Sequence, residues 1–262
     1  MTIKSFALLG LVGLALVAGC GSSDDDKPAA AEGTPNKQGA SAATTSTITA
    51  VQTAIKPSAG GAPGDSGQSS ATQLASAAQA TQNLVTPAAG TAARSLPGLE
   101  LADLLRPLAP TAGQTGTCTC TADSCTFVAC SNGSLIIDGT YSYGAGKIKA
   151  TGLKYTINVG GAAAAAGIAT ADVVITIDAD ITTTATSIDG TFHSAGSTNT
   201  SAGGQTYSSS WDSTLQYKAV AFPSGGGAPT GGSVSVASTT NVAAGGASQA
   251  YQASFDVTFP AN

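Results

Sequence analysis

Charged residues, aromatic residues and histidine are scarce in this sequence of 262 residues. Charged residues make up 10% of the chain, aromatic residues make up 5%, and His193 is the single histidine. The net charge is −5 and the basic residues do not cluster, whereas nucleic-acid binding depends on such a cluster. Residues 107–262 contain no Glu and no Arg, so acid–base pairs there would need Asp, Lys, Tyr or His193. This composition argues against a nucleic-acid-binding protein and against an enzyme, and we expect no cofactor and no metal.

Large apolar residues are also few, and they are unevenly distributed. Leu, Ile, Val and Phe together number 47, of which nine lie in residues 1–17 and 26 in residues 115–262. Residues 21–94 hold only six, too few to offset the entropy that a chain loses on folding. The sequence therefore predicts an apolar N-terminus, a sparse middle segment and a folded C-terminal domain.

The N-terminus has the features of an export signal. Lys4 supplies a positive charge, and the apolar stretch from Phe6 to Val17 is too short to span a bilayer as a helix. It runs into Leu16-Val17-Ala18-Gly19-Cys20, which resembles the lipobox of bacterial lipoproteins. The resemblance implies removal of residues 1–19, acylation of Cys20 with palmitate or similar chains, and anchoring to a membrane. Gly21, not Asp, follows the cysteine, which by the same resemblance implies the outer membrane.

Residues 20–94 are predicted to form a low-complexity tether that carries the lipid. Residues 21–45 are mostly Ser, Asp, Ala, Gly and Pro, which indicates a flexible linker. A coil of about 75 residues would span roughly 45–50 Å and hold the domain clear of the lipid headgroups. Weak helical patterns at 46–56 and 70–86 could be helices docked on the domain or transient structure. Leucines at helical spacing predict a further short helix over 95–110, which we expect to cover a sheet.

Residues 115–262 alternate apolar and polar residues, as antiparallel strands with one buried face do. The clearest examples are Val173–Ile181, Leu215–Ala221 and Tyr251–Phe259. We expect about eight to ten strands, with a bulge at Thr151-Gly152. The predicted Gly- and Ala-rich loops are 160–171, 196–205, 223–232 and 241–249. The fold class is therefore mainly β, an antiparallel sandwich or a curled half-barrel sheet, preceded by the disordered tether and one to three short helices.

A short motif occurs twice in this domain. Ile137-Asp138-Gly139-Thr140-Tyr141 returns as Ile188-Asp189-Gly190-Thr191-Phe192. Each Asp-Gly pair could form a tight turn or lie within a strand, and both alternatives remain open at this point.

Four cysteines, Cys118, Cys120, Cys125 and Cys130, are the most specific internal feature. In an exported chain they predict two disulfides, since zinc sites usually contain C-x2-C pairs and this spacing is C-x-C-x4-C-x4-C. Three pairings are possible. A hairpin that turns at residues 122–124 would bring Cys120 to Cys125 and leave Cys118 for Cys130. The cluster, the strand Leu135–Thr140 and the ending Val257–Phe259 together resemble uncharacterised β-rich lipoproteins of proteobacteria, a resemblance that implies no activity.

Three functions compete. The leading hypothesis is a non-catalytic envelope lipoprotein, a structural or binding module for a protein, glycan or lipid partner. The alternative is a carrier of lipid or another apolar ligand, an open half-barrel with residues 97–106 as its lid. A hydrolase would require His193 together with an Asp and a Ser within hydrogen-bond reach. Alternation instead places His193, Asp178 and Asp180 on the outward, solvated face of their strands, without a role as calcium ligands or paired acids.

Overall fold

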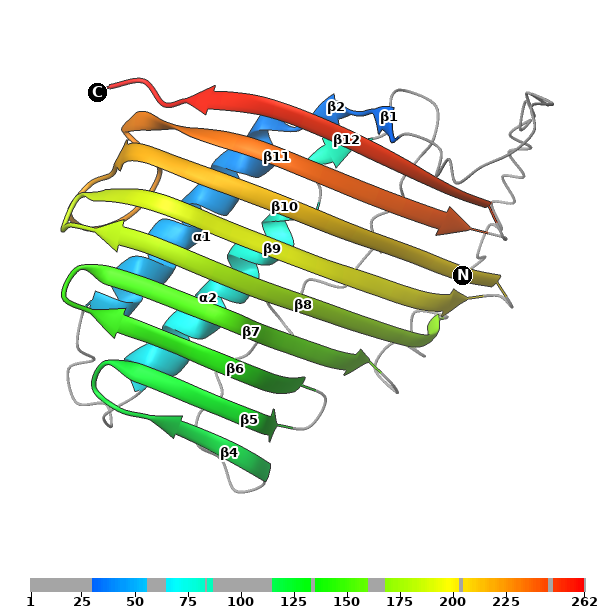
Figure 1. Ribbon diagram of the computed structural model, residues 1–262, viewed down its shortest axis with the longest axis horizontal. Helices are drawn as coiled ribbons and strands as arrows, with labels where there is room; N and C mark the ends of the chain where they lie inside the picture. Colours follow the sequence, from blue (N-terminus) through cyan, green and yellow to red (C-terminus); the bar gives the residue numbers. More distant parts are fainter. Residues whose placement is uncertain are drawn as a thin grey trace, which may run out of the picture.

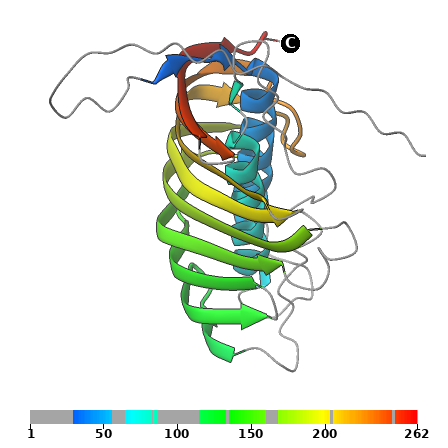
Figure 2. The same cartoon turned by 90° about the vertical axis from the view of Figure 1, so that its right-hand side faces the viewer.

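The computed structural model describes residues 30–55, 65–82, 84–86, 115–132, 135–159, 168–202, 205–244 and 247–261. These residues form one open sheet of ten strands, two helices packed on one face of it, and a small two-stranded sheet. Figure 1 shows β12 and β4 at opposite edges of the large sheet, with α1 and α2 crossing behind the strands. Figure 2 shows that both helices lie on the same side of the sheet.

The element bounds follow the chain in a simple order. The segment before the large domain holds β1 (Ala31–Glu32), β2 (Thr34–Pro35), α1 (Lys37–Ile55), α2 (Asp65–Thr81) and β3 (Val85–Thr86). The remaining strands are β4 (Thr115–Cys120), β5 (Ser124–Asn132), β6 (Leu135–Gly144), β7 (Lys147–Val159), β8 (Ile168–Thr183), β9 (Ser187–Ala202), β10 (Gln205–Ala221), β11 (Gly231–Ala244) and β12 (Ala247–Thr258). From β4 to β12 each strand pairs antiparallel with the next, and β1 adds to β12 in parallel.

The mainly β fold class is confirmed, with two short helices before the sheet. In the described part of the chain the second layer is helical, which differs from the two large sheets of a sandwich. The predicted loops at 196–205 and 241–249 are wrong for most of their length, because β9, β11 and β12 extend through them. Apart from Val242, those segments lack large apolar residues, so they show no clear alternation, yet Ser and Thr form favourable pairs across antiparallel strands.

The helices α1 and α2 fold from sequence that holds few large apolar residues. Asn36 is the N-cap of α1, because its Oδ1 accepts a hydrogen bond from the Gly39 backbone N–H at 2.9 Å. The buried side of α1 consists mostly of small residues: Ala40, Ala43, Thr44, Thr47, Ile48, Ala50, Val51 and Ala54. Thr44 and Thr47 donate to the carbonyls four residues earlier, at 2.8 and 3.0 Å, which satisfies their hydroxyls inside the helix. Because the side chains on this buried side are small, α1 can pack close to the sheet.

These helices revise the predicted boundary of the tether. The flexible linker predicted for residues 21–45 is wrong for 31–32, 34–35 and 37–45, which belong to β1, β2 and α1. The weak patterns at 46–56 and 70–86 coincide with parts of α1 and α2. The number of Leu, Ile, Val and Phe does not predict these helices, because Ala and Thr fill most of their buried positions. The predicted helix at 95–110 lies outside the described residues.

The core lies between the helices and the inner face of the sheet. Its large, fully buried side chains include Ile48 of α1, Leu74 of α2 and Leu215 of β10. Strands β6 to β9 contribute Ile137, Tyr141, Ile148, Leu153, Tyr155, Ile157, Ile175, Ile177 and Phe192. These residues alternate along their strands with exposed polar residues, as the sequence predicted. The helices therefore cover the apolar face of the sheet, and the polar face points away from them.

At three of the bulges in the described strands, an Asp from a neighbouring strand stabilises the bulged backbone. The residue at each bulge has a positive φ: 46° at Ala129, 53° at Gly152 and 47° at Ala219. Their backbone N–H groups donate to Asp138 at 2.6 Å, to Asp178 at 2.8 Å and to Asp189 at 2.6 Å, respectively. The bulge predicted at Thr151-Gly152 is confirmed by the register shift between β7 and β8.

The repeated Asp-Gly pairs belong to these bulges and lie within strands. Gly139 and Gly190 have φ values of 110° and 125°, which favour glycine. A Cβ at either position would overlap a backbone carbonyl of the next or previous strand, Gly152 or Asp180. In each motif the Asp binds a bulge on one side of its strand, and the Gly leaves room for a carbonyl on the other.

Candidate functional site

The four cysteines form two disulfides, as predicted. Cys118 bonds to Cys130 with an S–S distance of 2.03 Å, and Cys120 bonds to Cys125 at 2.06 Å. Both bonds join β4 to β5, and β4 is the edge strand of the sheet. The cysteines are therefore structural, and they hold the outermost strand in place. Cys20, the predicted lipidation site, lies outside the described residues.

The outer face of the sheet is exposed in the described part of the chain. On β8 to β12 its side chains are mostly hydroxyls, amides and carboxylates, and no described element packs over them. Central examples are Thr176, Asp178, Thr191, His193, Asp212, Thr214, Gln216, Ser235, Thr239, Gln252 and Ser254. These positions carry no Phe, Trp or Tyr.

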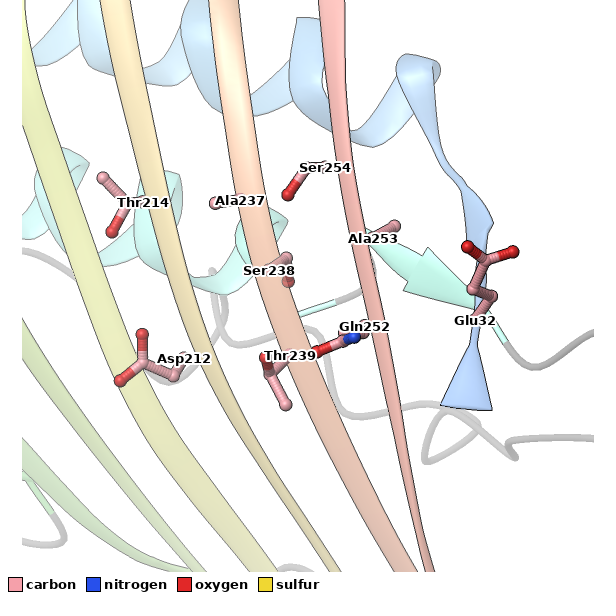
Figure 3. Close-up of a pocket in the computed structure, with 9 residues that line it drawn as sticks. All are labelled: Glu32, Asp212, Thr214, Ala237, Ser238, Thr239, Gln252, Ala253 and Ser254. Carbon is pink, nitrogen blue, oxygen red and sulfur yellow. The ribbon is translucent and has the colours of Figure 1, made fainter. Parts of the chain in front are cut away.

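Two adjoining hollows lie on this face over β11. The larger, about 550 Å³, extends from Asp212 on β10 to Glu32 on β1, with Thr239 and Gln252 between them (Figure 3). The smaller, about 310 Å³, lies beside Gln216 and Asp256 and shares Thr214, Ala237 and Ser254 with the first. They arise because β11 carries small side chains between longer ones on β10 and β12. Both hollows are shallow and open to solvent.

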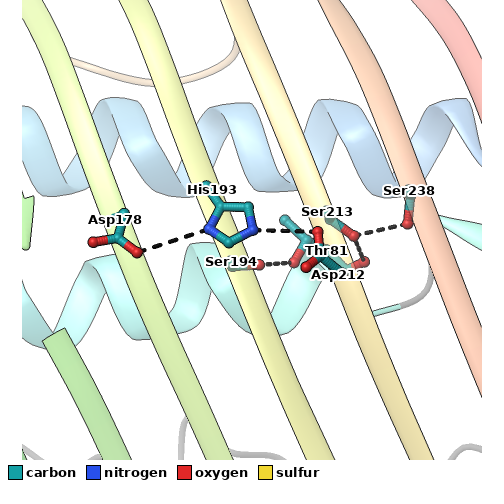
Figure 4. Close-up of polar contacts among 7 residues, drawn as sticks. All are labelled: Thr81, Asp178, His193, Ser194, Asp212, Ser213 and Ser238. Carbon is teal, nitrogen blue, oxygen red and sulfur yellow. Dashed lines mark hydrogen bonds and ion pairs between the residues drawn. The ribbon is translucent and has the colours of Figure 1, made fainter. Parts of the chain in front are cut away.

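His193 lies between two carboxylates on the outer face. Its Nδ1 is 3.8 Å from Asp178 on β8, and its Nε2 is 3.2 Å from Asp212 on β10 (Figure 4). All three side chains are at least one-third exposed, so the attraction is screened by water. The outward position predicted for His193 and Asp178 is confirmed. Asp212 was missed, because only the β9–β10 register brings it next to His193.

This cluster lacks the remaining parts of a hydrolytic site. Among the described residues, no hydroxyl hydrogen bond to His193 is present, and Ser194 points to the opposite face, where it contacts Thr81 (Figure 4). The described residues also hold no group of three or more His, Cys, Asp or Glu arranged to bind a metal ion. The geometry is that of a surface cluster of polar side chains that links three strands.

Hydroxyl groups connect the helices to the inner face of the sheet. Tyr141 contacts Ser70 at 2.5 Å, Tyr217 contacts Thr47 at 2.9 Å, and Tyr155 donates to the Ala71 carbonyl at 2.6 Å. Burial raises the pKa of all three tyrosines, because the charged phenolate is poorly solvated there. Ser213 of β10 likewise donates to the Thr81 carbonyl at 3.3 Å and contacts Ser238 (Figure 4). Polar bonds as well as apolar contacts therefore fix the helices.

The fold and this site together define a class of architecture, an open antiparallel sheet backed by two helices and displaying a broad polar face. Comparisons with protein-family models, curated proteins and solved structures find no match for the chain. Neither described helix is long and apolar enough to cross a membrane. The function must therefore be argued from the residues alone.

Proposed function

We propose that this protein is a lipid-anchored lipoprotein of the bacterial envelope, placed at the outer membrane, whose sheet is a non-catalytic binding or structural module. The observation that carries this proposal is the contrast between the two faces of the sheet. Helices fill one face with buried side chains, and no described element covers the other, which is wide, polar and nearly free of large apolar groups. A rigid sheet with one open polar face suits contact with a hydrated partner.

Anchoring rests on the lipobox sequence that ends at Cys20. The test is incorporation of labelled palmitate and separation of cells into membrane and soluble fractions, for the wild type, Cys20→Ala and the control Ser23→Ala. Wild type and Ser23→Ala should be labelled and membrane-bound, because several acyl chains anchor stably. Cys20→Ala should be unlabelled and soluble. Continued membrane association of Cys20→Ala would refute lipid anchoring.

The packing of the inner face is why we favour this module over a carrier of lipid. A carrier needs an apolar chamber between sheet and helices. In the described part of the chain that space holds side chains such as Leu74, Leu153 and Phe192, all with no exposed area. Lipid copurified in stoichiometric amount with the Cys20→Ala protein, and released on unfolding, would favour the carrier instead.

The binding role of the outer face is tested by its accessibility in the envelope. Gln216→Cys places a thiol on the exposed face of β10, and Ser224→Cys places one in the exposed turn after it. N-ethylmaleimide labelling is compared in intact envelopes and in the purified protein. We expect Gln216→Cys to react several-fold more slowly in envelopes and Ser224→Cys to react equally in both. Equal rates at both positions in both preparations would contradict a partner on this face.

A further inference from the structure

The first described strand shortens the connection between the lipid and the folded part. Ala31 and Glu32 form β1 on the edge of β12, and the Gly33 N–H donates to the Gln252 carbonyl at 2.9 Å. Only residues 21–30, here called the anchor segment, separate this strand from Cys20. Even fully extended, the eleven Cα steps from Cys20 to Ala31 reach no further than about 40 Å. The connection is therefore a short one that ends at a defined corner of the sheet.

That corner includes a free backbone edge. The Gln252 carbonyl points away from β11. Because the direction of the backbone N–H and C=O groups alternates along a strand, those of Ser254, Asp256 and Thr258 also point away from β11. Among the described residues no strand pairs with them, because β1 ends at Glu32. An uncovered edge of this kind would accept another strand and promote aggregation.

The chemistry of the corner favours a hydrated neighbour. Ser254, Asp256 and Thr258 are exposed, and Glu32 adds a second carboxylate. Insertion into a bilayer needs exposed apolar groups and usually basic residues. The apolar side chains Phe255 and Val257 of β12 are partly buried against the core, and residues 219–262 contain no basic residue. The edge can therefore stand beside lipid headgroups without entering the apolar interior.

We propose that the β1–β12 corner is the side of the folded part that faces the headgroup layer, and that this layer shields the free edge of β12 from other strands. This inference rests on the proposed lipid anchor at Cys20. The anchor segment keeps the corner near the membrane, whereas β4 lies eight strand spacings away, about 38 Å. The outer face and the disulfide-bonded β4–β5 hairpin are thereby directed toward partners away from the membrane.

The test measures distance to the membrane at two matched serines of the outer face. Ser254→Cys on β12 and Ser142→Cys on β6 are both exposed. Each full-length lipidated protein carries a donor dye there and is reconstituted into phosphatidylethanolamine–phosphatidylglycerol vesicles that contain a headgroup-labelled acceptor. We expect energy transfer at least twofold higher from position 254 than from 142. Equal transfer, or higher transfer from 142, would overturn the inference.

Two further variants separate this inference from the anchor itself. If Cys20→Ala protein still floats with the vesicles, the lipid anchor is refuted. If only the lipidated protein floats, but its two labels give equal transfer, the orientation alone is refuted. A long Gly/Ser insertion between Asp26 and Lys27 should keep the protein on the vesicles and reduce the difference between the labels. A difference unchanged by the insertion would show that the anchor segment does not set the orientation.

Discussion

Phe192 and Tyr155 are fully buried on the inner face of the sheet, whereas their chain neighbours Thr191 and Lys154 are exposed on the outer face. The sheet thus carries two surfaces of different composition, one apolar with a few hydroxyls bonded to helices, the other mostly polar. The difference shows that packed helices cover only one side of this sheet. Its stability should come from the inner face, and its contacts with other molecules should come from the outer one.

The largest expected difference between the faces is in the cost of truncating a side chain. Phe192→Ala should lower the free energy of unfolding by about 3–5 kcal/mol, because it leaves a cavity under the helices. Thr191→Ala, one residue earlier on the exposed face, should change it by less than about 0.5 kcal/mol. Urea unfolding followed by the fluorescence of the single Trp211 measures both. Similar costs for the two variants would mean that the faces are misassigned.

At the β4 edge the two disulfides stabilise the sheet in addition to the packing of its inner face. Replacing Cys118 and Cys130 by Ser should destabilise the protein by about 3 kcal/mol, as expected for a loop of this length. Replacing Cys120 and Cys125, which close a shorter loop, should cost about 2 kcal/mol. Unfolding curves of the two double variants provide the comparison. A larger loss from the shorter loop would contradict the chain-entropy explanation.

The buried tyrosines make the inner face sensitive to alkali. Tyr141, Tyr155 and Tyr217 keep their protons when folded, because burial raises their pKa, whereas in the unfolded chain they titrate near about 10. The free energy of unfolding should therefore be unaffected by these groups below about pH 10 and fall as the pH rises above it. Tyr155→Phe should cost about 1 kcal/mol at neutral pH, through the lost bond to Ala71. It should also flatten the alkaline decline, and an unchanged slope would argue against burial as the cause.

The smallest expected effect is the loss of a hydrogen bond that stabilises a bulge on the outer face. Asp189→Ala removes the acceptor for the Ala219 N–H at its bulge and should cost about 1 kcal/mol or less, since the site is exposed. Asp180→Ala, an exposed carboxylate of the same face on β8, is the matched control and should be neutral. Asp189→Asn keeps an acceptor oxygen and should recover most of the loss. Equal stability of the two Ala variants would show that the bulge bond contributes nothing.

The sequence predicts the sheet better than its surroundings, for physical reasons that particular residues illustrate. Alternation at Val173–Ile181 and Tyr251–Phe259 identifies strands, because one face is apolar. The helices were only partly anticipated, since Ala43 and Thr47 are buried without being large. The ends of β9 and β11 were missed because small residues such as Ser, Thr and Ala give no clear period.

The candidate site was partly predictable. Local spacing was enough to predict the disulfides among Cys118, Cys120, Cys125 and Cys130, and alternation placed Asp178 and His193 outward. The contact of His193 with Asp212 and the hollow between Asp212 and Glu32 depend on strand register, which the sequence leaves open. Side-chain contacts between strands can be predicted only when the register of the strands is known.

The central claim, that helices close one face of the sheet and leave the other open, is tested most directly by thiol reactivity within β10. Ser213→Cys places a thiol on the inner face and Gln216→Cys places one on the outer face, three residues apart. In the purified folded protein we predict that N-ethylmaleimide labels Gln216→Cys at the rate of a free thiol. Labelling of Ser213→Cys should be slower by about a hundredfold or more until urea unfolds the domain. Comparable rates in the folded state would contradict the account.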